Sequence, residues 1–101
     1  MSYTHAADKS VLADLGERLR RARLARNLTQ QRLAYEAGVG TATLRRLEAG
    51  QGASLVNVIR VLRALGLLDR LEQVIPPPAP DPIEQLESQR GMRQRARDRS
   101  L

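Results

Sequence analysis

The sequence predicts an all-α protein in which five short helices form one compact domain, followed by a disordered tail rich in Pro and Arg. Apolar residues recur at the three- and four-residue spacing of a helix face in successive segments. Thr, Ser and Gly stand where such segments begin and end. Only 2% of the residues are aromatic, so the core must consist of Leu, Val, Ile and Ala, which suits packed helices better than strands.

The first helix is expected from about Ser10, after a flexible N-terminal segment of residues 1–9. Its predicted inward face follows steps of three, four and three residues. The residues of this face are Leu12, Leu15, Leu19 and Ala22. Asn27 is the expected end of the helix.

Thr29 is the predicted N-cap of a second helix over residues 30–37. Its inward face is expected to consist of Leu33, Ala34 and Ala37. Gly38 should end this helix, because glycine adopts the left-handed conformation at little cost. Val39 is apolar in an otherwise polar turn, so we expect it to fill the space between this helix and the next.

A third helix is predicted over residues 41–49, with Leu44 and Leu47 as its apolar pair. Ser54 is the predicted N-cap of a fourth helix, and Gly66 ends it. The wide apolar stripe of this fourth helix comprises Leu55, Val58, Ile59, Leu62 and Leu65. The connections between these successive helices are only a few residues long, which is typical of a small helical bundle.

A short fifth helix, LLDRLEQV, is predicted to place Leu68 and Leu71 inward and to complete a domain over residues 10–75. The composition then changes. PPPAPDP predicts a polyproline spacer, and the remainder of residues 76–101 has little to bury.

Within this tail, Ile83 and Leu86 form a weak helical candidate that would dock in the groove of a partner. The Arg-rich end would add non-specific affinity for DNA. An ordinary disordered tail without a partner is the alternative.

The formal net charge is +6, and sixteen of the seventeen basic residues are Arg. Guanidinium groups suit bidentate contacts with phosphate or guanine, so this composition indicates a polyanionic partner, with solubility or coding bias as the alternative explanation. The chain has no Cys, which excludes disulfides and thiolate metal sites and is compatible with the cytoplasm. No apolar run approaches the roughly 18 residues of a membrane span.

The sequence offers no catalytic constellation, so we expect neither an enzyme nor a cofactor. Its single His, His5, lies in the N-terminal segment without a second ligand. Asp81, Glu84 and Glu87 are spaced by three in the tail, where solvated carboxylates are expected rather than a metal site.

Residues 29–50 have the layout of a helix-turn-helix, with two short helices joined by a Gly-containing turn. Because Leu44 and Leu47 hold the third helix, over residues 41–49, against the core, its other side chains face outward to varying degrees. These are Thr41, Ala42, Thr43, Arg45 and Arg46. A DNA major groove admits one such helix, and Arg46 is long enough to bind O6 and N7 of guanine.

The stretch LTQQRLAYEAGVGTATLRRLEAG resembles the Xre/Cro/C1 family of helix-turn-helix regulators, whose pattern is T-Q-x-x-L-A-x-x-A-G-V-S and then a recognition helix ending I-x-x-[IL]-E-x-G. The matching residues are Thr29, Gln30, Leu33, Ala34, Ala37, Gly38, Val39, Leu47, Glu48 and Gly50. The resemblance covers about residues 12–75. It implies a lambda-repressor-like five-helix fold and a homodimer on a palindromic operator in double-stranded DNA. Gly40 departs from the pattern, because the family usually has Ser or Thr there to cap the recognition helix.

The resemblance also implies which residues contact DNA. Thr29 and Gln30 would face a backbone phosphate at the start of the second helix, with a flanking base as an alternative for Gln30. Thr41, Ala42, Thr43 and Arg46 would face the groove, and Arg45 would lie nearer the backbone.

Arg23 and Glu48 occupy positions that form a partly buried ion pair in family members, so we expect a structural role without direct DNA contact. The other Arg residues of the first helix region are interpreted as a solvated face, of which one or two reach phosphates. They are Arg18, Arg20, Arg21 and Arg26. Tyr35 is interpreted as a partly buried support.

The layout of the whole chain is also similar to HipB-type antitoxins, which repress their own operon and bind a HipA-like serine/threonine kinase toxin. Three successive prolines argue against the C-terminal strand that helps to close the best-known dimer of that type. Dimerisation is therefore expected through the fourth and fifth helices, at Leu67, Leu68 and Leu71.

The resulting prediction is a cytoplasmic, nucleoid-associated and autoregulatory repressor. The sequence leaves open whether it is a phage-type repressor, an antitoxin or a stand-alone regulator. The alternative is a protein-interaction module that neutralises a toxin or other partner and binds DNA only non-specifically.

Overall fold

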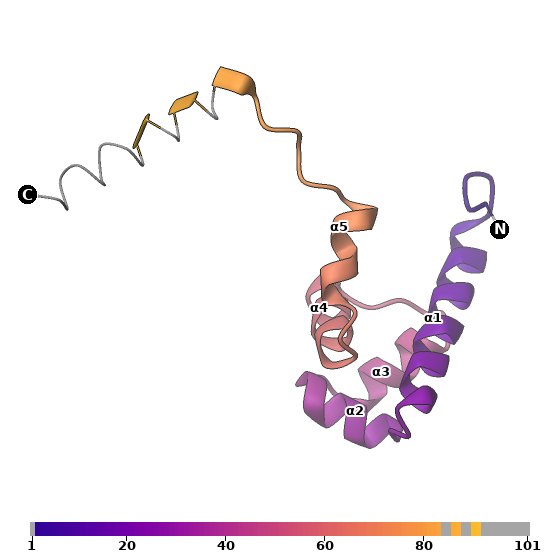
Figure 1. Ribbon diagram of the computed structural model, residues 1–101. Coiled ribbons are helices and arrows are strands. Elements are labelled where there is room, and N and C mark those ends of the chain that lie inside the picture. Colours follow the sequence, from indigo (N-terminus) through magenta and orange to yellow (C-terminus); the bar gives the residue numbers. More distant parts are fainter. Residues whose placement is uncertain (1, 84–85, 88–89, 92–101) are drawn as a thin grey trace, which may run out of the picture. The chain divides into compact units, whose positions relative to one another are not determined.

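The computed structural model describes residues 2–83, 86–87 and 90–91, and in this part of the chain every regular element is helical (Figure 1). The elements are α1 (Asp8–Ala25), α2 (Gln30–Ala37), α3 (Thr41–Glu48), α4 (Leu55–Ala64), the 3-10 helix η1 (Leu68–Arg70) and α5 (Leu71–Val74). The prediction of an all-α, five-helix fold is confirmed. The chain divides into two units, of which the first ends at Leu71.

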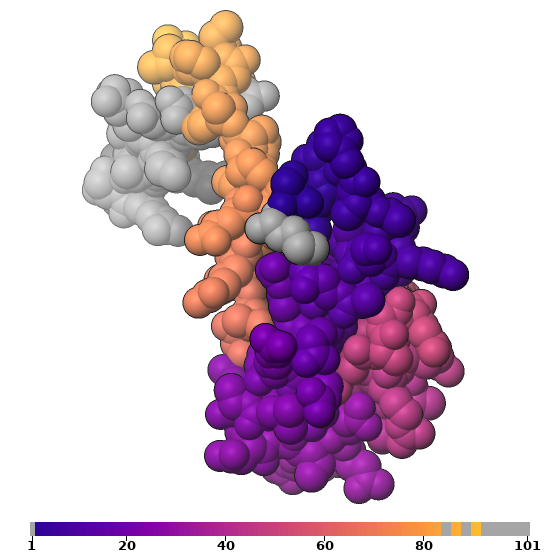
Figure 2. Space-filling view, turned by 90° about the vertical axis from the view of Figure 1, so that its right-hand side faces the viewer, coloured from indigo at the N-terminus to yellow at the C-terminus, as the bar shows by residue number. Residues whose placement is uncertain are grey.

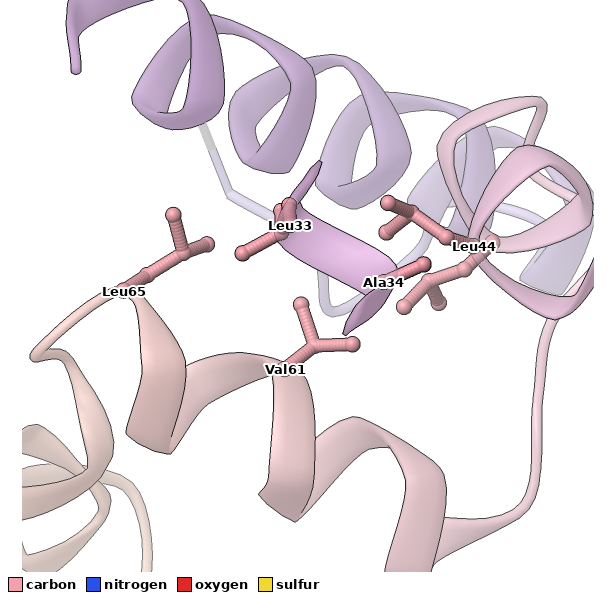
Figure 3. Packing of buried hydrophobic residues seen from close by; sticks show 6 residues of the cluster. Leu33, Ala34, Leu44, Val61 and Leu65 are labelled. Atoms are coloured by element: carbon pink, nitrogen blue, oxygen red, sulfur yellow. The ribbon is translucent and has the colours of Figure 1, made fainter. Parts of the chain in front are cut away.

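The core of the first unit lies where α1 packs on α3 and α2 packs on both α3 and α4. Its buried apolar residues are Leu33, Ala34, Leu44, Leu47, Val61 and Leu65, and Figure 3 shows five of them facing one another. The predicted inward residues of α2 and α3 are thus confirmed. Val39 packs against the same cluster, as predicted for the residue that fills the turn.

The prediction of an inward-facing position is wrong for three residues. Leu12 and Leu15 are 37% and 42% exposed because the N-terminal turns of α1 extend beyond α3 (Figure 1). Leu55 is 72% exposed, whereas Val61, outside the predicted stripe, is fully buried. The apolar surface of α4 is wider than its contact with α2, so the stripe alone did not show which part becomes covered.

The contact between α1 and α3 is close enough to require glycine at two positions. A Cβ at Gly16 would lie 2.6 Å from the carbonyl oxygens of both Leu47 and Glu48. A Cβ at Gly50, where φ is +79°, would lie 2.8 Å from Cα of Ala13. Figure 2 shows α1, in indigo and violet, along the face toward the viewer, with the pink middle part of the sequence beside it.

The helix ends follow the predicted chemistry. The hydroxyl of Thr29 accepts a hydrogen bond from the Arg32 amide at 3.0 Å, and that of Ser54 accepts one from Asn57 at 3.2 Å. Gly38 is left-handed with φ of 72°. Asn27, the expected end of the first helix, has φ of 57°, a conformation that Asn tolerates better than most residues.

The first helix begins at Asp8, two residues before the expected start. Ahead of it, the hydroxyl of Tyr3 donates to the carboxylate of Asp14, and this hydrogen bond raises the pKa of Tyr3. Arg18 lies over the Tyr3 ring and also pairs with Asp14 at 3.1 Å.

The predicted fifth helix is divided into η1 and the four-residue α5. Leu68 and Leu71 are half-buried, and Leu67 packs against the core. In the second unit, residues 76–81 have no regular secondary structure.

The described residues 82–83, 86–87 and 90–91 are helical, and Asp81 accepts a hydrogen bond from the Ile83 amide at 3.0 Å. Our expectations for Glu84 and for residues 92–101 of the Arg-rich end lie outside the described residues.

Candidate nucleic-acid interface

The helix-turn-helix is formed by α2, the turn Gly38-Val39-Gly40, and α3. The Val39 amide donates to the carbonyl of Ala34 at 3.0 Å, which closes the end of α2 and directs the chain into the turn. Gly40 is the N-cap of α3, with φ of −70° and ψ of 149°, and supplies no side-chain cap. The first amides of α3 therefore have no acceptor from the helix or from a capping side chain.

The two faces of α3 differ in exposure. Leu44, Leu47 and Glu48 are buried, whereas Ala42, Arg45 and Arg46 are exposed. Thr41 and Thr43 are half-buried at the boundary of the two faces. Among the described residues, no carboxylate lies within 4.0 Å of Arg45 or Arg46, so both guanidinium groups are available to an anionic ligand.

Beneath this surface, Arg23 and Glu48 form a buried bidentate ion pair. Arg23 Nε donates to Glu48 Oε2 at 2.8 Å, and Arg23 Nη2 donates to Glu48 Oε1 at 2.9 Å. The two side chains are 8% and 3% exposed. Arg23 Nη1 also donates to the carbonyl of Leu28 at 2.8 Å, so the pair joins α1, the α1–α2 connection and the end of α3.

Gln30 has a contact that our sequence reasoning did not predict. Its Nε2 donates to Glu48 Oε1 at 3.2 Å, which connects the first residue of α2 to the buried ion pair. The side chain is half-buried, and Thr29 beside it is exposed. No pattern in the sequence indicated this contact, because it depends on how closely the start of α2 approaches the end of α3.

The interpretation of Tyr35 as a partly buried support is wrong, because this residue is 78% exposed. The inward residues of α2 lie at spacings of three and four, and Tyr35 is off that pattern. Arg32 lies 5.7 Å from the centre of its ring and pairs with Glu36 at 2.9 Å.

Arg26 differs from the predicted solvated face in one respect: its Nη1 donates to the carbonyl of Ala64 at the end of α4, at 3.3 Å. The other three Arg residues of this group form exposed pairs within α1, Arg18 with Asp14, and Arg20 and Arg21 with Glu17.

Within residues 2–83, 86–87 and 90–91, no three His, Asp or Glu side chains are grouped so that they could hold a metal ion. In the same ranges, none of the helices combines the length and the apolar character that crossing a membrane requires.

Comparison with known proteins supplies the family. The model of a helix-turn-helix domain family matches residues 14–74, which is more than half of the chain. The chain belongs to this family. A search of curated proteins gave no significant match.

Among solved structures, the chain is similar to the restriction-modification controller protein C.AhdI from Aeromonas hydrophila. The two sequences are 35% identical, and the match covers 60% of this chain and 94% of the controller, with a TM-score of 0.57. The resemblance to Xre/Cro/C1 regulators is thereby confirmed. This helix-turn-helix protein is a DNA-binding regulator of transcription rather than an enzyme.

Proposed function

We propose that this protein is a sequence-specific repressor that inserts α3 into the major groove of its operator. The observation that carries this proposal is the outward face of α3, where Ala42, Arg45 and Arg46 are exposed and both Arg residues lack an acidic partner among the described residues. A guanidinium that is not neutralised within its own molecule is free to bind a base edge or a phosphate.

Each exposed or half-buried residue of α3 has a role in this proposal. Arg46 binds O6 and N7 of a guanine, and Thr41, Ala42 and Thr43 contact neighbouring base edges or a thymine methyl group. Arg45 lies nearer the phosphate backbone. At the start of α2, Thr29 and Gln30 face a phosphate, where the free amides of the helix N-terminus favour an anion.

The operator is palindromic in this proposal because the protein binds as a homodimer. The proposed contact comprises Leu67, Leu68 and Leu71, which are only half-buried. We further propose autoregulation, with the operator upstream of the protein's own gene.

Fluorescence anisotropy tests the proposal, with the DNA upstream of the gene and a shuffled duplex titrated over a range of salt concentrations. Sequence-specific binding predicts that the upstream duplex keeps its affinity at salt concentrations that release the shuffled one. If the two affinities fall together, the Arg residues provide only non-specific attraction to DNA, and sequence-specific repression is wrong.

A second candidate function concerns the second unit, as a segment that binds a protein partner such as a HipA-like kinase toxin. Its support is the exposure of Ile83 and Leu86, which are 64% and 55% exposed on helical residues three positions apart. Such a pair would dock in an apolar groove. Neither comparison involves a toxin, so the identity of the partner is a prediction from the layout of the chain alone.

Deleting residues 76–101 tests this second function. The truncated protein should keep its affinity for the upstream duplex and lose binding to the product of the neighbouring gene in a pull-down of the two purified proteins. Equal binding by the full-length and truncated proteins would show that the tail is not the docking segment.

A further inference from the structure

The hydrogen bond between Gln30 and Glu48 connects a residue at the proposed DNA surface to a buried carboxylate that is already paired. Both oxygens of Glu48 accept hydrogen bonds from Arg23, at 2.8 and 2.9 Å, and the Glu48 side chain is 3% exposed. Arg23 is itself held by the carbonyl of Leu28, two residues before Gln30. The carboxylate therefore has one defined position relative to the start of α2.

A glutamine side chain has several rotatable bonds, so at a helix end its amide samples many directions. Here Nε2 of Gln30 donates one of its two hydrogens to Glu48 Oε1 at 3.2 Å. This bond fixes the amide plane and leaves the second N–H free. The ion pair does not need Gln30 for its own completion, because Arg23 already satisfies both oxygens of Glu48.

We propose that Glu48 is a positioning residue for DNA binding: it holds the Gln30 amide so that its free N–H points to a phosphate before DNA arrives. The proposal rests on the proposed function, because it requires that the start of α2 faces the DNA backbone. It assigns Glu48 a second role beside the ion pair. Pre-organisation of this kind raises affinity by removing the ordering cost at the moment of binding.

The first test uses two variants of Gln30. Gln30→Ala removes the amide, and Gln30→Asn keeps an amide that is one methylene too short to reach both Glu48 and the phosphate. We expect each to weaken binding to the upstream duplex about three- to tenfold, the range of one net hydrogen bond. Because the amide is neutral, the slope of affinity against salt should stay unchanged, unlike the loss of an Arg–phosphate contact. Native affinity of Gln30→Asn would overturn the proposal, since the amide would then act without Glu48.

The second test is a double-mutant cycle with Glu48→Gln, measured at a temperature where circular dichroism shows every variant folded. If Glu48 acts on DNA through Gln30, the loss caused by Glu48→Gln should disappear in the Gln30→Ala background. Losses that simply add would show that Glu48 affects binding by another route. The Gln30→Asn result decides the question if Glu48→Gln does not fold.

Two controls distinguish a loss of the positioning role from a loss of stability and from a failure of the proposed repressor function. Val61→Ala removes a buried side chain of the core and leaves both Gln30 and Glu48 in place, so it should lower the melting temperature while leaving affinity unchanged in the folded protein. Arg46→Ala tests base recognition independently. If Arg46→Ala abolishes the preference for the upstream duplex while both Gln30 variants bind normally, the positioning role fails and the repressor function stands.

Discussion

The inward and outward faces of α3 perform different tasks within eight residues. The inward face carries Leu44 and Leu47 in the core and Glu48 in the buried ion pair. The outward face carries Arg45 and Arg46, which are exposed and have no acidic partner among the described residues. Folding and base recognition therefore depend on different residues of the same helix: changes to Leu44 or Leu47 should alter folding, and changes to Arg45 or Arg46 should alter binding. Glu48 lies between the two tasks, because it completes the buried pair and, in our proposal, also positions Gln30.

The largest effect should come from removing one member of the buried pair. Glu48→Ala leaves the Arg23 charge buried without a partner, so the free energy of unfolding should fall by about 3–5 kcal/mol. Urea denaturation followed by circular dichroism measures this loss. The matched control is Glu36→Ala, which removes an exposed pair with Arg32 and should cost less than about 1 kcal/mol. Equal losses in the two variants would mean that the Arg23–Glu48 pair is solvated in solution.

Gly16→Ala tests the close contact between α1 and the C-terminal end of α3. In most helices this change stabilises, but here the new Cβ would lie 2.6 Å from two carbonyl oxygens of α3. Overpacking of this kind should lower the free energy of unfolding by roughly 1–3 kcal/mol. A stabilised variant in the same denaturation experiment would contradict the close approach of α1 and α3.

Arg46→Ala tests the outward face. It should weaken binding to the upstream duplex by about 1–3 kcal/mol, because a bidentate contact with guanine is lost, and leave binding to random DNA nearly unchanged. Stability should change by less than about 0.5 kcal/mol, as for other exposed positions. Arg45→Ala is the matched control and should weaken binding to both duplexes alike. Equal loss on both duplexes for Arg46→Ala would exclude its proposed role in base recognition.

The smallest effect should come from Gly40→Ser at the start of α3. The backbone there is extended, and a Cβ would meet only the Thr43 hydroxyl at 3.8 Å, so a capping serine fits without strain. The gain in stability should be about a few tenths of a kcal/mol, measured by thermal denaturation. Gly38→Ser is the opposite control, because φ of 72° should cost a serine about 1–2 kcal/mol. Destabilisation by Gly40→Ser would mean that α3 does not start at Thr41.

The local features of this protein follow from short stretches of its sequence. Thr29 and Ser54 cap helices, Asn27 and Gly38 end them, and residues 38–40 form the predicted turn before α3. These features could be predicted because each depends on the steric limits and hydrogen bonds of a few neighbouring residues. The helix-turn-helix layout followed from them, and with it the outward position of Arg45 and Arg46.

Which apolar residues become buried and which polar groups meet depends instead on how the helices pack against one another. Leu12 and Leu55 follow the helical pattern yet stay exposed, because no neighbouring helix extends far enough to cover them. The contact of Gln30 with Glu48 joins residues eighteen positions apart, and that of Arg26 with Ala64 joins residues thirty-eight apart. Periodicity gives the direction of a side chain on its own helix, but the length and approach of the facing helix determine what that side chain touches.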